Sequence, residues 1–474
     1  MTQQVGTADV ENPEESGSSW WNPRVWPAGV WLLLIGAFVM LVPFGIRMVM
    51  LAGVPAIAEP FDVAEFARWD VPANQDAFTE YRLAVGMHER ITADLRLRSR
   101  TEPTNFDVVS EQGWSAADEP LKEWLELHRE ALTVWKKGTA KQQGMSQAPD
   151  QLTFDSILIS IREMRSFVRM AMLEEERCIH EGRFDEAWRW ARAANRSGGH
   201  TSYRGSLIQG LVGIAIHASS MAGMARWAER PEVTSEQLKS ALADVKSDYR
   251  LYELPSNVLK AEYLALRNTL RSRSWIQFVD VPSFVDQTSP VTGVAMKMLY
   301  WVVGEPELTL RISRHVLANQ LSEIDKPLRE RRKLASLGLV MLFDPDPAAP
   351  RLPGQLDPAR IDRAINRSLV SRSGLRATQQ FDQGVLRQMA KQAAIEVLLA
   401  AQAYRRDHGE FPETLLSLVP NYLDEVPSDP FNPKGGPMLY RRDEPEKAVV
   451  WSLGSDGIDG GGNVATPTAD VVSS

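Results

Sequence analysis

The chain has 474 residues, a formal net charge of −8 and a single cysteine, Cys178. A single cysteine excludes an intrachain disulfide and a metal site built from several cysteines. The acidic balance, with no large basic face, argues against nucleic acid as a main partner. The length is sufficient for about two or three domains.

The first 24 residues predict a disordered acidic tail, 1–24. They are polar and rich in Gly, Ser and Glu, a composition that cannot bury enough apolar surface to fold. Their acidic residues are Asp9, Glu11, Glu14 and Glu15.

Residues 25–46 predict a single transmembrane helix that anchors the chain in a lipid bilayer. No charge occurs between Arg24 and Arg47, and at about 1.5 Å per residue the stretch spans roughly 33 Å, enough to cross a hydrocarbon core of about 30 Å. A buried core helix would show a polar stripe, and a cleavable signal peptide would begin with basic residues and have a shorter apolar core. Tryptophans crowd its start, as at a membrane boundary: Trp20, Trp21, Trp26 and Trp31.

Residues 47–343 predict a helical body, because apolar side chains recur at helical spacing and no convincing run of alternating strand residues occurs. Helical hairpins are expected from helices at 74–100, 121–135 and 154–179. Further helices are expected at 235–249, 257–271, 291–303, 305–320 and 326–343. The fold class is therefore mainly α.

One hairpin in the body has a recognisable pattern. The segment EGRFDEAWRWARAA places a glycine, an aromatic residue and small residues as in the turn and second helix of a tetratricopeptide (TPR) hairpin, so this unit is TPR-like. No repeat at a period of about 34 residues follows. Gly198 and Gly199 are expected to end the second helix. An acidic patch near the turn is expected to be a solvated helix end: Glu174, Glu175, Glu176, Glu181 and Asp185.

The stretch Leu207–Ala228 is long and apolar enough to suggest a second membrane span. Polar residues interrupt it, and its glycines and alanines suit close helix packing. We therefore expect a buried core helix. The interrupting residues are Gln209, His217, Ser219 and Ser220.

Residues 344–379 predict a Pro-rich linker and a connecting helix. Its prolines interrupt helices and favour extended backbone, and they are Pro345, Pro347, Pro350, Pro353 and Pro358. This segment is the main predicted domain boundary.

Residues 380–463 predict a small α+β module, followed by a disordered tail, 464–474. A long helix runs from about Leu386 to Gly409, with Arg405 and Arg406 in its last turn, where positive charge is favourable. Strands are expected at 438–441 and 448–452.

The order of residues in this module resembles the globular part of type II secretion major pseudopilins, over about residues 391–463. The residues that carry the resemblance include Gly409, Phe411-Pro412, Tyr422-Leu423, Asp429-Pro430-Phe431 and Ser452-Leu453-Gly454-Ser455-Asp456-Gly457. The whole chain also looks like uncharacterised membrane-anchored proteins of planctomycete-type bacteria. The chain lacks the basic leader and Phe-first helix of a pseudopilin, so we expect a pseudopilin-like domain on an anchored helical protein rather than a pilus subunit.

The resemblance implies a calcium site in the loop after the last predicted strand. Carried over by position, Leu453 offers its carbonyl, and Ser455 and Asp456 offer side-chain oxygens. Asp459 and Asn463 are added because Ca²⁺ prefers about six to eight oxygen ligands on a flexible backbone. The alternative is that Asp and Gly here simply form consecutive turns.

No motif of a known catalytic site occurs, and the seven histidines are scattered. His88 and His217 are interpreted as structural, and Cys178 and His180 do not share a helical face. The leading hypothesis is a non-enzymatic structural or interaction protein of the bacterial envelope, with protein partners there and a possible link to secretion. The alternative is an envelope enzyme, hydrolase-like, whose site is dispersed over the helical body. Because pseudopilin modules work outside the cytoplasmic membrane, we expect a single-pass protein of the inner membrane with its N-terminus inside and its bulk in the periplasm.

Overall fold

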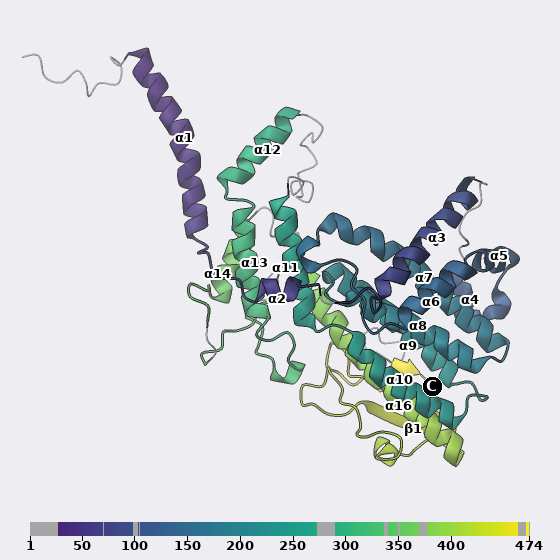
Figure 1. Ribbon diagram of the computed structural model, residues 1–474. Coiled ribbons are helices and arrows are strands. Elements are labelled where there is room, and N and C mark those ends of the chain that lie inside the picture. The colour runs from purple at the N-terminus through teal and green to yellow at the C-terminus, as the bar shows by residue number, and fades with distance from the viewer. Residues whose placement is uncertain are drawn as a thin grey trace, which may run out of the picture.

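The computed structural model describes residues 27–69, 71–97, 103, 105–272, 290–335, 340–348, 351–368, 377–462 and 471–473. These residues are mostly helical, with one small sheet near the C-terminus. The prediction of a mainly α fold is therefore confirmed (Figure 1).

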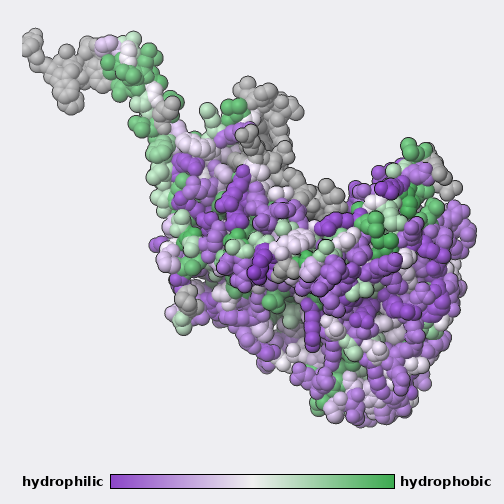
Figure 2. Space-filling view, viewed as in Figure 1, coloured by the Kyte–Doolittle hydropathy of each residue, from purple (hydrophilic) through white to green (hydrophobic). Residues whose placement is uncertain are grey.

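The N-terminal helix α1, Ala28–Ala52, projects from the rest of the protein (Figure 1). Its most apolar stretch is 0% buried, and it is one of two helices among the described residues that are long and apolar enough to cross a membrane. Figure 2 shows hydrophobic residues along its length, in contrast with the largely hydrophilic body. The predicted anchor is thus a candidate span, and it continues past Ile46. The predicted tail and residues 25 and 26 lie outside the described residues.

The last turn of α1 is packed into the body. Leu51 and Val54 are 7% and 4% exposed and join a cluster with Leu308 and Ile312 of α13, Glu307–Gln320. Residues of α14, Pro358–Arg367, complete this cluster, which we call the α1 socket: Leu51, Val54, Leu308, Ile312, Val316, Val340, Leu342, Ile361, Ala364 and Ile365.

The carbonyl groups at the end of α1 are bound by two side chains of α13. Arg311 Nη1 donates to the carbonyls of Leu51 and Val54 at 3.1 and 3.2 Å. His315 Nε2 donates to the carbonyl of Pro55 at 3.0 Å. A helix leaves its last carbonyls without intrahelical partners, and cations are favourable there, so these contacts fix the direction in which α1 leaves the body.

The first part of the body contains more helices than expected. After α2, Val63–Ala67, and α3, Ala77–Leu97, two short elements lie between the helices expected at 74–100 and 121–135: α4, Phe106–Gln112, and η3, Trp114–Ala116. The single helix expected at 121–135 is wrong, because α5, Glu119–Leu127, and α6, Arg129–Thr139, are separated at His128. His128 Nδ1 donates to the Trp124 carbonyl at 2.8 Å, and such a local side-chain bond competes with helix continuation.

The TPR-like hairpin corresponds to α7, Phe154–His180, and α8, Phe184–Ser202, with Gly182 in a left-handed conformation (φ 71°) at the turn. The expected stop at Gly198 and Gly199 is wrong, because α8 continues to Ser202. These glycines let α8 approach its neighbours: a Cβ on Gly198 would lie 3.0 Å from the carbonyl oxygen of Gly213, and one on Gly199 would lie 2.7 Å from Leu251 Cβ.

Helix α9, Leu207–Ala228, packs against α7, α8 and α16, and 56% of its most apolar stretch is buried inside the protein. The preference for a core helix over a second span agrees with this burial. The next helices lie close to their predicted positions: α10, Ser235–Asp248, with a capping box formed by Thr234 and Gln237, then η5, Tyr249–Leu251, α11, Pro255–Arg271, and α12, Pro290–Val302.

The helix expected at 326–343 is wrong. The described part of this segment holds only the short η7, Leu328–Glu330, and a bridge between Leu334 and Phe343. Side chains of α13 hold the extended backbone: Asn319 Nδ2 donates to the Phe343 carbonyl and Gln320 Nε2 to the Met341 carbonyl, both at 2.9 Å. The free energy gained by burying Phe343 in the body therefore outweighs the local helical preference that the spacing of apolar residues indicated.

The C-terminal module shares its core with the body. Helix α16, Ala377–His408, packs against α9 and α10, and the buried residues of its C-terminal half, from Ala393 to Ala403, belong to the same cluster as Phe411 and Val450 of the module. Strands β1, Leu439–Glu444, β2, Lys447–Trp451, and β3, Val471–Ser473, form an antiparallel sheet in the order β1-β2-β3. The first two strands confirm the prediction, whereas β3 lies in the tail predicted to be disordered. The domain boundary at 344–379 stays a prediction.

The acidic patch expected on a solvated helix end is wrong for three of its members. Glu174, Glu175 and Glu176 are 3%, 0% and 4% exposed. Glu174 pairs with Arg177 and Glu176 with Arg226, whereas neither oxygen of Glu175 has a hydrogen-bond partner among the described residues. Burial raises the pKa of Glu175 to about 8, so this carboxyl is protonated at neutral pH.

We predict that Gly213→Ala destabilises the protein. Its Cβ would lie 2.8 Å from the carbonyl oxygen of Gly198, and overpacking of this kind costs about 1–3 kcal/mol. The matched control is Gly86→Ala in α3, where a Cβ meets nothing within 4 Å and the change stabilises by up to about 1 kcal/mol. Thermal unfolding of the detergent-solubilised protein measures both, and equal melting temperatures for the two variants would contradict the close α8–α9 contact.

We predict that Glu175→Gln stabilises the protein increasingly as the pH rises from 5 to 8. The unfolded chain releases this proton near the ordinary pKa of 4.5, whereas the folded protein holds it until about 8, so wild-type stability falls with rising pH by up to about 1.4 kcal/mol per unit. The amide removes this dependence. Melting temperatures at pH 5 and 8 test it, with the exposed Glu111→Gln as control; a constant difference between Glu175→Gln and wild type would refute the assignment.

Candidate functional site

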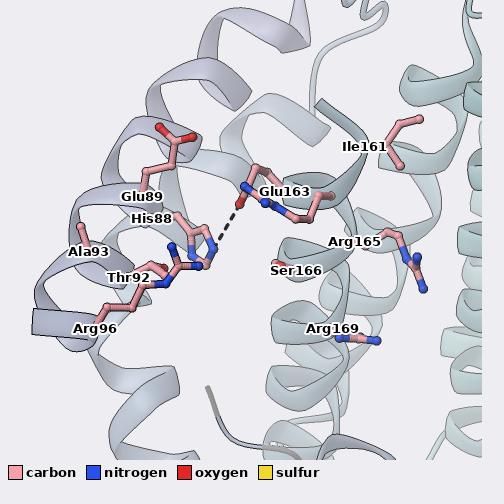
Figure 3. Close-up of a pocket in the computed structure, with 11 residues that line it drawn as sticks. His88, Glu89, Thr92, Ala93, Arg96, Ile161, Glu163, Arg165, Ser166 and Arg169 are labelled. Atoms are coloured by element: carbon pink, nitrogen blue, oxygen red, sulfur yellow. Dashed lines mark hydrogen bonds and ion pairs between the residues drawn. The ribbon is translucent and has the colours of Figure 1, made fainter. Parts of the chain in front are cut away.

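A cleft of about 580 Å³ lies between α3 and α7 (Figure 3). Helix α7 contributes Arg162, Arg165 and Arg169, whose spacing of three and four residues places them on one side of a helix. Helix α3 contributes its own residues from the facing side. The residues that line the cleft are His88, Glu89, Thr92, Ala93, Arg96, Ile161, Arg162, Glu163, Arg165, Ser166 and Arg169.

His88 and Glu163 join the two helices inside the cleft. His88 Nε2 lies 3.2 Å from Glu163 Oε2, and Figure 3 shows the two side chains facing each other across the gap. Their residues are 7% and 3% exposed. Arg162 Nε donates to the other oxygen of Glu163 at 2.8 Å, so this buried carboxylate is bound from both sides.

Two aromatic rings pack against the His88 ring. The His128 ring lies 4.9 Å from the His88 ring, and the Phe167 ring lies 5.6 Å from it. His128 is fully buried, and burial together with the nearby His88 lowers its pKa to about 4. His128 is therefore neutral at pH 7 and adds no charge beside His88.

The charged lining of the cleft is predominantly positive. Four arginines face two glutamates, and Glu163 is already bound to His88 and Arg162. Within the described ranges, Arg96 and Arg165 have no ion-pair partner. Arg169 lies 5.8 Å from the ring centroid of Phe106. Because guanidinium groups bind carboxylates and phosphates in a bidentate manner, the arrangement is suited to an anionic ligand.

A second, larger cavity of about 730 Å³ lies between η5, α16 and the loop at 424–432. Several of its charged residues are already paired: Arg331 with Asp382 at 2.6 Å and Lys246 with Asp424 at 3.0 Å. This cavity is a weaker candidate than the α3–α7 cleft, because its lining contains both acidic and basic side chains and so favours neither an anionic nor a cationic ligand.

The residues predicted to bind calcium are only partly brought together. Asp456 Oδ1 accepts from the Ile458 N–H at 3.1 Å, and Asp459 Oδ1 accepts from Trp451 Nε1 at 2.9 Å and from the Gly461 N–H at 2.8 Å. Ser455 is exposed, and Asn463 lies outside the described residues. No group of three His, Cys, Asp or Glu residues is arranged for a metal within the described ranges. These contacts form turns, so the oxygens present fit Ca²⁺ poorly, and the calcium site stays a prediction.

The two sequence elements that carry the pseudopilin resemblance contact each other. Asp429 is 1% exposed, and its carboxylate accepts from Ser452 Oγ at 2.8 Å and from the N–H of Leu453 at 2.7 Å. It also accepts from the Phe431 N–H at 3.0 Å. Asp429 therefore holds the loop that precedes β1 against the end of β2, which is a structural role.

The histidines and the cysteine weighed from sequence have different outcomes. Cys178 is fully buried, which raises the pKa of its thiol to about 12, whereas His180 is exposed, so they do not form a nucleophile–base pair. His217 is buried beside Gln392, with its Nε2 3.3 Å from Oε1. His88, interpreted as structural, lies in the candidate cleft.

Sequence reasoning missed the arginine row and the partner of His88. The spacing of Arg162, Arg165 and Arg169 in the predicted helix 154–179 was a usable signal, because it places three cations on one helical side. The pairing of His88 with Glu163 joins residues 75 positions apart, and no local pattern predicts it.

Fold and cleft together define a mainly helical protein with a candidate N-terminal membrane span and a cationic cleft between two helices. Comparison with protein-family models, with curated proteins and with solved structures finds no match to this chain. The pseudopilin and TPR resemblances therefore remain predictions from the sequence.

Proposed function

We propose that this protein is a non-enzymatic, membrane-anchored interaction protein of the bacterial envelope, and that its α3–α7 cleft binds an acidic segment of a partner protein. The observation that carries this proposal is the arginine-lined cleft, in which Arg96 and Arg165 have no ion-pair partner among the described residues. Helix α1 supplies the anchor, because its apolar surface is exposed over most of its length.

An acidic peptide suits this cleft better than the rest of the surface. The chain as a whole carries a net charge of −8, so its average field repels acidic ligands. A cluster of cations on such a protein selects both a binding place and a ligand charge, because an acidic segment is disfavoured elsewhere. The cleft is formed by two helix surfaces, which present an elongated site to an extended segment.

The proposed topology follows from the sequence. The resemblance of residues 391–463 to pseudopilin domains supports a single-pass protein of the cytoplasmic membrane with the N-terminus inside and the bulk in the periplasm. A link to secretion rests on the same resemblance.

We predict that a fluorescent hexaglutamate peptide binds the detergent-solubilised protein and that binding weakens with added salt. Arg96→Ala and Arg165→Ala should each weaken binding about tenfold, since a charge-assisted hydrogen bond contributes about 1.5–3 kcal/mol. Fluorescence anisotropy measures the dissociation constant.

The matched control for this experiment is Arg90→Ala, an exposed arginine of α3 that does not line the cleft. Its affinity should equal that of wild type. Equal weakening by all three variants would show a diffuse charge effect, and no binding of hexaglutamate to wild type would refute the acidic-peptide site.

We predict that the full chain stays in the membrane pellet after alkaline carbonate and is released by detergent, because a spanning helix inserts stably. A variant without residues 1–46 should be released by carbonate and remain folded, because it retains Arg47 and the α1 socket. The mass of the mature protein gives a separate readout. Loss of the N-terminal residues in the native protein would identify α1 as a signal sequence and refute the anchor.

The alternative function, an envelope enzyme, is supported by the His88–Glu163 pair, which is the arrangement of a general base and its orienting carboxylate. It ranks second for two reasons. The pair is nearly buried, and Arg162 holds the carboxylate in place.

A further inference from the structure

Helix α12 exposes apolar residues on the side that does not pack on the body. Tyr300 is 2% exposed and, with Met296, packs against Leu266 and Leu270 of α11. The residues exposed on the other side are also apolar: Val294 (58% exposed), Met298 (67%), Leu299 (47%) and Trp301 (47%). In Figure 2, hydrophobic residues are visible in the region where Figure 1 places α12.

Exposure to water does not explain why this face of α12 is apolar. A surface helix of a soluble protein has a polar face opposite its buried face, whereas a helix that is apolar all round belongs in a core or a membrane. Lys297 is the single charged residue of α12, and a lysine can extend its ammonium group to the membrane surface.

The C-terminal end of α12 is joined to α1. Arg47 Nη1 donates to the Trp301 carbonyl at 2.6 Å, and its guanidinium lies 5.1 Å from the centre of the Trp301 ring. Just after α12, Gly304 (φ 89°) lies so close to Leu51 that a Cβ would be 3.1 Å from Leu51 Cδ2. Arg47 therefore marks the level on α1 at which α12 begins to diverge from it.

This level coincides with the expected edge of the bilayer. The uncharged residues 28–46 of α1 extend for about 28 Å at 1.5 Å per residue, close to the thickness of the hydrocarbon core. Arg47 and Trp301 are of the types that favour the membrane–water boundary. Figure 1 shows α12 leaving this level on the same side of the body as α1.

We infer that the exposed face of α12 lies in the interface of the same bilayer that α1 crosses, as a second membrane contact. This inference rests on the proposed anchor. With two contact elements, α1 and α12, joined at Arg47, the body cannot rotate freely about α1, so the α3–α7 cleft is presented at a defined angle to the membrane.

The test places a single label at each of three exposed positions in the full chain, in separate variants: Met298→Cys in α12, Val39→Cys in α1 and Leu416→Cys in the module. The native Cys178 is fully buried, with the pKa of its thiol raised to about 12, so a thiol-reactive fluorophore labels the introduced cysteine. The labelled proteins are reconstituted into phosphatidylcholine–phosphatidylglycerol vesicles, and quenching by nitroxide-labelled lipid is measured.

The expected result is strong lipid quenching at positions 39 and 298 and none at 416, which is 75% exposed and belongs to the distant module. Quenching at 39 without quenching at 298 would overturn the inference and leave the anchor intact. Absence of quenching at 39 would overturn the anchor, and with it the proposed shared bilayer.

A second copy of the chain is the competing occupant of this face. Oxidation of the unlabelled Met298→Cys protein in vesicles tests for it directly. A high yield of disulfide-linked dimer that does not fall as lipid is added would assign the face to self-association and overturn the inference. A dimer yield that falls with lipid dilution supports the membrane contact.

Discussion

The α1 socket is the contact on which the arrangement of this protein depends. An apolar helix that projects from a folded body could adopt any direction if its end were a free chain, but Leu51 and Val54 are buried between α13 and α14. Arg311 and His315 bind the carbonyls at and just beyond the end of α1, where a helix lacks intrahelical partners. The anchor is therefore rigidly connected to the body at the α1 socket. This connection determines how the body faces a membrane that α1 crosses.

Inside the body, helices α8 and α9 pack at very short distance. Gly198 on α8 and Gly213 on α9 meet without side chains between them, which brings polar backbone within van der Waals distance and leaves little tolerance for larger residues. Against the same α9 lies α16, which continues into the small sheet. The module is thus built on a helix that the body also uses, even though its sequence reads as a separate unit.

The cationic cleft shows how an acidic protein can present a local positive site. Glu163 is bound by His88 and Arg162, while Arg96 and Arg165 are left without ion-pair partners among the described residues. His128, which packs behind His88, stays neutral, because burial lowers its pKa to about 4. The charge is consequently concentrated at the accessible surface, where a ligand can neutralise it.

Local and periodic features were readable from the sequence: the uncharged stretch that became α1, the helices α7, α9 and α10, and the strands β1 and β2. These depend on interactions between residues close in the chain, so spacing alone predicts them. Tertiary structure decided the rest. It turned Gly198 from a helix stop into a contact point and folded the segment at 326–343 against α13. It also buried three glutamates, and it paired His88 with Glu163 across the cleft. Each of these outcomes depends on the free energy of contacts between distant segments, which outweighs the small local preferences that sequence patterns record.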